Sequence, residues 1–178
     1  MSAAWAVIEN EGESALVHVT DFDAMTRADA IELMQPCCAS RRWISEVVSG
    51  RPYGSMRRLI SASHDVLADL GWGDLAEALA AHPRIGDRAG GSDRESAWSR
   101  QEQRGAGASA VAADLLAGNI AYEQRFGHIF LICATGRSPE QMLAELQQRL
   151  TNPTEVEREV VRAELREIVR LRLIKTFR

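Results

Sequence analysis

The chain has 178 residues, of which 46% are hydrophobic and 26% charged, and its formal net charge is −4. This composition predicts one globular domain that buries about two thirds of the surface of its unfolded chain, and it excludes a disordered or membrane-embedded protein. Because the charge shows no basic excess, nucleic acid is not the expected partner.

Cysteine usage and the two chain ends predict a cytoplasmic protein. Three cysteines, with Cys37 and Cys38 adjacent, cannot form a fully paired disulfide framework, so a reducing compartment fits best. Acidic residues between positions 9 and 13 interrupt the apolar core that a signal peptide needs, and no run is long enough to span a membrane. The final residues differ from a peroxisomal Ser-Lys-Leu ending.

Helical patterns follow one another through the first half of the chain. Residues 1–20 show no lasting period and are predicted to be an N-terminal extension, so the domain is expected to span residues 21–178. Serines that can cap a helix, and glycines or prolines that end one, divide the region that follows. The expected helices cover residues 24–34, with Asp21 or Thr26 as the cap, 41–49, 56–70 and 75–81.

Glycines divide the middle of the chain. Residues 86–92 form its most loop-like stretch and are expected to cover a site. A helix is expected to start near Ser99 and to end at Gly118, and Asn119 can cap a turn after it.

The last third of the chain holds one ambiguous run between helices. Residues 128–134 are apolar and fit a strand or a helix, because hydrophobic periodicity does not decide between the two. Ser138-Pro139 and Asn152-Pro153 each start a helix, the second about 24 residues long. Since no repeat and no series of alternating strands is present, we predict an all-α fold, a compact single-domain bundle of about seven to nine helices.

His82 stands where a helix must end, because Pro83 disfavours helical geometry in the residue before it. The carbonyl end of the preceding helix is expected to favour the imidazolium form of the ring, which suits a proton donor. A lone histidine at a helix end is more often only a cap. The residues alone therefore leave a structural and a catalytic role open for His82.

Glu102 also has two roles open to it. Ser99-x-x-Glu102 is itself a capping box at the start of a helix. The same helix start presents free N–H groups that suit an anionic or ureido-bearing ligand.

Arg172 is the charged residue that helical periodicity singles out. On a helical wheel it falls within the apolar stripe to which Leu165 and Val169 belong, whereas Arg162 and Arg166 lie away from that stripe. An arginine in this position reaches the edge of the core, pairs with an internal carboxylate or meets an anionic ligand, because an unpaired buried charge is strongly unfavourable.

No metal and no cofactor is predicted. His82 and Glu102 lack the H-E-x-x-H spacing of a zinc site, and the cysteines are unsuitably placed for metal binding. The chain also lacks a G-x-G-x-x-G turn for a nucleotide and a lysine in a recognised imine-forming context.

Five motifs occur in order: His82-Pro83-Arg84-Ile85-Gly86, Ser99-x-x-Glu102-Gln103, Asn119-x-x-Tyr122-x-x-Arg125-Phe126-Gly127-x-x-Phe130, Gly136-Arg137-Ser138 and Leu171-Arg172-Leu173. Together with Cys37-Cys38, Trp43 and Arg51-Pro52-Tyr53-Gly54-Ser55 upstream, they resemble the 2-oxo-4-hydroxy-4-carboxy-5-ureidoimidazoline (OHCU) decarboxylase family. The resemblance covers roughly residues 20–177. That family acts late in urate breakdown and forms (S)-allantoin.

The resemblance implies a cofactor-independent carboxy-lyase of purine catabolism with a helical fold. It implies His82 as the proton donor, Glu102 as its orienting or substrate-binding partner and Arg172 as an electrostatic clamp. It further implies a substrate-binding set, the later part acting largely through backbone groups: Pro83, Ser99, Arg100, Gln101, Glu102, Gln103, Phe130, Leu131, Ile132, Cys133 and Ala134. The expected partners are a small-molecule substrate and a second copy in a homodimer, with neither nucleic acid nor membrane.

Three alternatives remain at this stage. The chain could be a helical regulator that binds a ureide without turnover, another cofactor-free enzyme of ureide metabolism, or a purely structural bundle. The joint presence of His82, Glu102 and Arg172 favours catalysis over binding alone, and a structural bundle gives no reason for Arg172 on an apolar stripe.

Overall fold

The computed structural model describes residues 16–82 and 106–178, and these ranges contain eight helices and no β-strand. The helices are α1 (Val19–Ala24), α2 (Arg27–Met34), α3 (Arg41–Ser49), α4 (Met56–Asp69), α5 (Trp72–Ala80), α7 (Ala106–Phe126), α8 (Pro139–Arg149) and α9 (Thr154–Thr176). The all-α prediction is confirmed. In the described ranges, no helix combines the length and the apolar character needed to cross a membrane.

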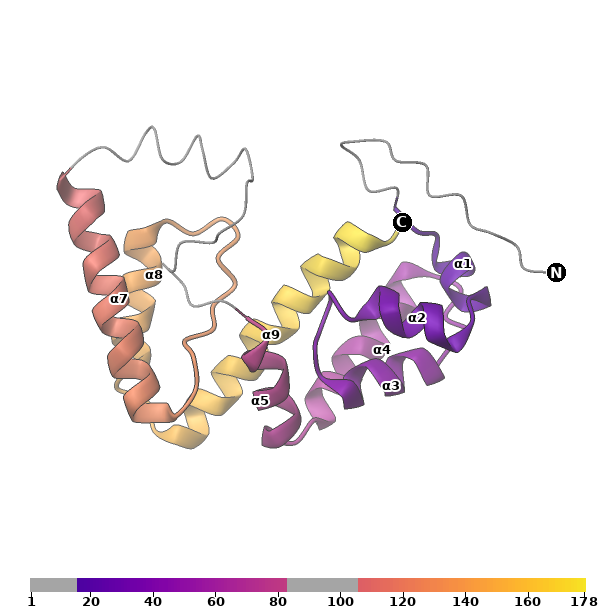
Figure 1. Ribbon diagram of the computed structural model, residues 1–178, viewed down its shortest axis with the longest axis horizontal. Helices are drawn as coiled ribbons and strands as arrows, with labels where there is room; N and C mark the ends of the chain where they lie inside the picture. Colours follow the sequence, from indigo (N-terminus) through magenta and orange to yellow (C-terminus); the bar gives the residue numbers. More distant parts are fainter. Residues whose placement is uncertain (1–15, 83–105) are drawn as a thin grey trace.

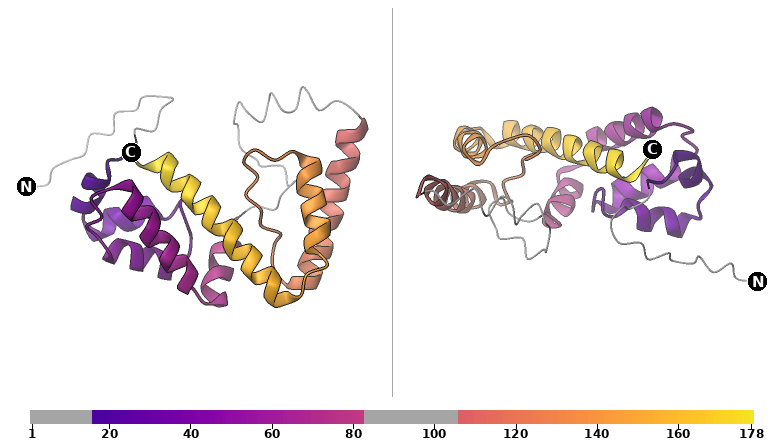
Figure 2. Two further views of the ribbon diagram at one scale, coloured as in Figure 1. Left: turned by 180° about the vertical axis from the view of Figure 1, so that it is seen from behind. Right: turned by 90° about the horizontal axis from the view of Figure 1, so that it is seen from above.

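Helix α9 runs diagonally through the molecule and joins its two halves (Figure 1). Helices α1 to α4 gather around its C-terminal half, whereas α7 and α8 lie side by side near its N-terminal end, as the view from behind also shows (Figure 2). Each half has its own core. The larger hydrophobic cluster draws on α1 to α5 and α9, and the smaller one on α7, α8 and the chain between them.

The short helices of the first half begin where their capping serines predict. The Ser40 hydroxyl accepts a hydrogen bond from the Trp43 amide at 3.3 Å, and the Ser55 hydroxyl accepts one from the Arg58 amide at 3.5 Å. Trp43 is fully buried, and its indole N–H donates to the Ser63 hydroxyl of α4 at 3.2 Å. The predicted helices at 41–49 and 56–70 are therefore confirmed within a residue.

Of the two caps that the sequence offers for the helix ending at residue 34, the structure uses Thr26, whose hydroxyl accepts a hydrogen bond from the Asp29 amide at 3.2 Å at the start of α2. Residues 19–24 form a separate helix, α1, which the pattern did not predict. The end of α1 is held from a distance, since the Arg51 guanidinium donates to the carbonyls of Phe22 and Met25. This contact joins residues far apart in sequence and explains why local pattern missed α1.

The chain just before α1 pairs with the end of α9. The Val17 amide donates to the Thr176 carbonyl at 2.9 Å, and the Arg178 amide donates to the Val17 carbonyl at 3.0 Å. Val19 and Phe177 are both buried in the larger cluster. Residues 16–20, which the sequence assigned to the extension, thus contact the helical core.

The break predicted at Gly118 is also wrong, because α7 continues through it to Phe126. Gly118 allows a close approach of α8, since a β-carbon there would lie 2.6 Å from a methyl carbon of Leu146. Asn119 is buried inside the helix and caps nothing. The predicted helix start at Ser99 lies outside the described residues.

The helix starts predicted at the two prolines are confirmed. Ser138 and Gln141 form a reciprocal capping box at the start of α8, and Pro139 is its first residue. Helix α9 begins at Thr154, directly after Pro153, and has 23 residues.

Candidate active site

His82 directly follows α5 and keeps its ring close to the last turn of that helix. The His82 amide donates to the Leu79 carbonyl at 2.9 Å, and ring atom Nδ1 lies 2.9 Å from the Ala78 carbonyl. A carbonyl oxygen only accepts, so the neutral ring carries its proton on Nδ1 and presents Nε2 as an acceptor. Nε2 is buried and has no hydrogen-bond partner among the described residues.

The Ala78 carbonyl at the helix end favours the imidazolium form of His82, as expected, but it does not decide the direction of the pKa shift. Burial lowers the pKa of His82 below its ordinary value of 6.5 and outweighs the Ala78 carbonyl contact, which raises the pKa. The positive charge of Arg172 lowers the pKa further. Loss of hydration penalises a charged ring more than one carbonyl contact favours it, so His82 is neutral at pH 7 in the resting protein.

Arg172 projects from α9 and is half-buried, as its place on the apolar stripe predicted. Its guanidinium donates to the Cys37 carbonyl at 3.3 Å. In the described parts of the chain, no carboxylate lies within ion-pair distance of it, so the internal-carboxylate alternative has no support there. Toward the described residues, this one long hydrogen bond leaves most of the five guanidinium N–H donors unused.

The charge of Arg172 acts on three groups that surround it. It lowers the pKa of His82, and it opposes the effect of burial on the thiols of Cys37 and Cys38. Burial still dominates at both thiols and raises the pKa of Cys38 to about 11. These thiols are therefore protonated at neutral pH and are poor nucleophiles.

Segment 128–134 links α7 to α8 as an extended chain that belongs to neither a helix nor a sheet. Leu131 packs into the larger cluster, whereas Phe130 and Ile132 pack into the smaller one. This alternation has the period of two that is typical of a strand. The side chains of residues 130–132 are thus occupied in the two cores, and a ligand can meet only their backbone.

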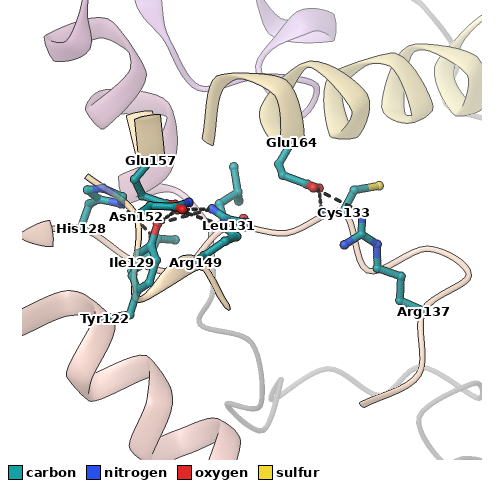
Figure 3. Close-up of polar contacts among 10 residues, drawn as sticks. All are labelled: Tyr122, His128, Ile129, Leu131, Cys133, Arg137, Arg149, Asn152, Glu157 and Glu164. Carbon is teal, nitrogen blue, oxygen red and sulfur yellow. Dashed lines mark hydrogen bonds and ion pairs between the residues drawn. The ribbon is translucent and has the colours of Figure 1, made fainter. Parts of the chain in front are cut away.

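Two charged side chains hold this backbone (Figure 3). Arg149 donates from Nη1 to the Leu131 carbonyl at 2.8 Å, and Glu164 accepts from the Cys133 amide at 2.7 Å. Glu164 also accepts from Arg137 at 3.3 Å. Arg149 is on α8 and Glu164 is on α9, so side chains from two helices hold the backbone of the segment.

A cavity of about 150 Å³ lies where the end of this segment meets the C-terminal half of α9. Its lining includes the predicted clamp and the end of the predicted wall: Cys133, Ala134, Thr135, Ile168, Leu171, Arg172 and Lys175. The fold therefore brings together two parts of the predicted site that are some forty residues apart in sequence. Pro83, Ser99, Arg100, Gln101, Glu102 and Gln103 lie outside the described residues.

Sequence reasoning missed a buried ion pair behind the segment. Arg149 and Glu157 are 2% and 0% exposed, and two guanidinium nitrogens donate to Glu157 Oε1 at 2.6 and 2.8 Å. Asn152 donates to the other carboxylate oxygen at 2.7 Å, and the Tyr122 hydroxyl donates to Oε1. Glu157 could have been found, because it stands four residues before Val161 on the apolar stripe; Arg149 gave no such signal.

The described residues contain no group of three or more histidine, cysteine, aspartate or glutamate side chains that could hold a metal. The absence of a cofactor and of a metal remains a prediction of the sequence.

Comparison with known proteins gives one consistent family. A family model described as OHCU decarboxylase matches residues 23–174. The 2-oxo-4-hydroxy-4-carboxy-5-ureidoimidazoline decarboxylase of Amia calva is 30% identical over 142 residues, which are 78% of this chain and 78% of that protein. The uric acid degradation bifunctional protein TTL of Arabidopsis thaliana is 32% identical over 146 residues, or 79% of this chain. The chain spans less than half of that bifunctional protein, 45% of its length.

Two solved structures are similar in fold. The crystal structure of an OHCU decarboxylase in the presence of (S)-allantoin superposes with a TM-score of 0.69 at 30% identity, covering 81% of this chain and 96% of the other. The crystal structure of an (S)-allantoin synthase gives a TM-score of 0.67 at 18% identity and covers 90% of this chain and 54% of the other, a likeness of fold alone.

Proposed function

Because this chain belongs to the OHCU decarboxylase family, we propose that it decarboxylates OHCU to (S)-allantoin, a late step of urate breakdown, without a cofactor. The observation that carries the proposal is the cavity where Arg172, half-buried and without a protein carboxylate in the described residues, meets the backbone of Cys133 and Ala134. A guanidinium in this state suits a substrate that brings its own carboxylate.

Arg172 acts as the electrostatic clamp. Its free donors bind the substrate carboxylate or a ring carbonyl and hold the ring against the backbone of Cys133 and Ala134. When the carbon–carbon bond to the carboxylate breaks, CO₂ leaves and the bonding electron pair stays in the ring as an enolate-like state. A fixed positive charge next to a ring in this state lowers the barrier, typically by a few kcal/mol.

After CO₂ has left, His82 delivers a proton to the neighbouring ring carbon, the one that bears the ureido group. Its resting ring is neutral, so Nε2 must first take up a proton before it can deliver one. The substrate's hydroxyl group becomes a carbonyl during the reaction and must lose its proton, which makes it a suitable source. We therefore assign to His82 a cycle of uptake and delivery, a step worth about 10²- to 10⁴-fold in rate.

The remaining family assignments are part of the same proposal. Glu102 orients His82 or binds substrate N–H groups, and residues 99–103 with Pro83 complete the substrate site. By the same resemblance we infer a cytoplasmic homodimer built from residues 21–178, with residues 1–20 as an extension whose Val17 and Val19 contact the helical core. Light scattering tests the dimer, for which the mass should be twice the chain's 19.6 kDa.

Stereochemistry provides the test of function. OHCU also loses CO₂ unaided, and protonation in free solution gives racemic allantoin. With the wild-type protein we expect faster loss of ultraviolet absorbance and (S)-allantoin in large excess, measured by circular dichroism before the product racemises. His82→Asn should fold normally yet abolish this excess, because asparagine can cap a helix end but cannot exchange a proton at neutral pH. Tight binding of OHCU without faster loss would instead favour a regulator.

A further inference from the structure

Segment 128–134 behaves as a strand without a sheet. Phe130, Leu131, Ile132 and Cys133 are all buried, between 1% and 7% exposed. Residues 130–132 alternate between the smaller and the larger cluster, so this part of the segment separates the two cores. Buried backbone amides and carbonyls need hydrogen-bond partners, which a strand ordinarily finds in its sheet.

Here the partners are side chains from two helices. The Leu131 carbonyl accepts from Arg149, and the Cys133 amide donates to Glu164. In extended backbone the polar groups of residues two apart point to the same edge, so both anchors act on one edge of the segment. The polar groups of residues 132 and 134 then point to the opposite edge.

The two backbone contacts, Arg149 to Leu131 and Glu164 to Cys133, lie in different surroundings. Arg149 acts at Leu131, whose side chain is already held in the larger cluster. Glu164 acts at Cys133, where the segment leaves the cores and begins to line the cavity. The carboxylate of Glu164 is 14% exposed, and its bond to the Cys133 amide is short and charge-assisted at 2.7 Å.

Glu164 also stands on the same helix as the clamp. It precedes Arg172 by eight residues, or two steps of four, so both project from one face of α9 about 12 Å apart along the axis. A continuous helix between them keeps this spacing rigid. The carboxylate that holds the Cys133 backbone therefore sets the position of that backbone relative to the guanidinium.

We propose that Glu164 is a positioning residue, which holds the backbone of Cys133 and Ala134 in register with Arg172 so that a carboxylate-bearing ring fits between them. The inference rests on the proposed function for its catalytic consequence. Its structural part, the anchor on the Cys133 amide, stands by itself.

The experiment compares two variants of matched length. Glu164→Met keeps the volume but removes the strong acceptor, whereas Glu164→Gln keeps an oxygen that can accept from the Cys133 amide. Glu167→Met is the control. Glu167 lies on the same helix, and in the described parts of the chain its carboxylate accepts hydrogen bonds from Arg170. Glu164→Ala serves as the second variant should Glu164→Met not fold.

Three quantities are measured well below the melting temperature: kcat/KM for OHCU, the optical purity of the allantoin formed, and the exchange rate of the Cys133 amide by NMR. Glu164→Met should lower kcat/KM about 10- to 100-fold, because misplacement by an ångström has this cost. It should also reduce the optical purity and speed exchange at Cys133. Glu164→Gln should stay within about threefold of wild type in all three, and Glu167→Met should match wild type.

A purely structural role for Glu164 predicts something else: a lower melting temperature with unchanged optical purity. The inference is overturned if Glu164→Met keeps wild-type kcat/KM and optical purity, or if the exchange of the Cys133 amide does not change. Failure of the wild-type protein to accelerate OHCU loss would overturn the proposed function instead. The exchange rates would then still test the hydrogen bond between Glu164 and the Cys133 amide. That bond is supported only if Glu164→Met speeds exchange of the Cys133 amide and Glu164→Gln does not.

Discussion

Two arginines near opposite ends of α9 differ in burial and in the number of hydrogen bonds that they make to the described residues. Near the N-terminal end, Arg149 of α8 is 2% exposed and meets Glu157, the Leu131 carbonyl and the Tyr122 hydroxyl. Its guanidinium also lies 4.7 Å from the centre of the Phe130 ring. Near the C-terminal end, Arg172 is only half-buried and, within the described ranges, makes one hydrogen bond, to the Cys37 carbonyl at 3.3 Å.

The difference teaches how to tell a structural charge from a functional one. A buried guanidinium whose three nitrogens all donate to protein groups stabilises the fold and has little left to offer a ligand. A guanidinium beside a cavity with most donors unused is prepared for an anion. Substitutions at the two arginines should therefore affect different properties of the protein.

The largest effect is expected on stability at the first arginine. Arg149→Met should lower the free energy of unfolding by about 3–5 kcal/mol, because it leaves the Glu157 carboxylate buried without its cation. Denaturant unfolding followed by circular dichroism measures this. Replacing Glu157 by Leu in the same protein should restore at least half of the loss, since two apolar side chains leave no buried charge. A single variant as stable as wild type would show that the pair is not needed.

The second arginine should show the reverse pattern. Arg172→Met should lower kcat/KM for OHCU about 10²- to 10³-fold, because the clamp acts on charge that develops in the transition state. Stability should hardly change, since methionine suits the apolar stripe. Arg170→Met is the control for both arginines, because Arg170 is only partly buried and pairs with the neighbouring Glu167 on α9. Full activity in Arg172→Met would remove the distinction between the two ends.

Two glycines, one in each half of the molecule, differ in how closely other side chains pack against them. Gly118→Ala should destabilise the α7–α8 half by about 1–3 kcal/mol, because the new methyl group meets the fully buried Leu146 side chain. Gly73→Ala in α5 meets no atom within 4 Å and should stabilise by about 0.5 kcal/mol through helix propensity. Thermal unfolding of both variants decides the point, and equal shifts would contradict the close approach at Gly118.

The smallest effect should be a gradual dependence of stability on pH. Burial lowers the pKa of His64, His82 and His128 below the ordinary value of 6.5. The unfolded chain therefore binds more protons than the folded one on acidification, and stability should fall as the pH drops below about 6.5. Denaturation midpoints between pH 7.5 and 5.5 test this. Each histidine changed to asparagine should flatten the slope, and a slope of opposite sign would contradict the burial of these rings.

Sequence pattern was sufficient wherever the cause of structure is local. Capping serines and N-terminal prolines located the starts of α3, α4, α8 and α9, because each cap acts within three residues. Pattern left two caps open for α2, one of them Thr26, and it failed at Gly118. The outcome at these two places depends on Arg51 and Leu146, which are distant in sequence.

For the site, the helical wheel alone identified Arg172, and Pro83 marked His82 as a helix end, because both follow from the geometry of one helix. The tertiary structure decided the burial of His82 and the hydrogen-bond partners of Arg172. Burial lowers the pKa of His82 and outweighs the helix-end carbonyl, which raises it, and no carboxylate of the described residues pairs with Arg172. Segment 128–134 is the clearest case. Its apolar run specifies burial but not conformation, and only the two cores on either side, with Arg149 and Glu164 supplying partners for its backbone, made it a strand without a sheet.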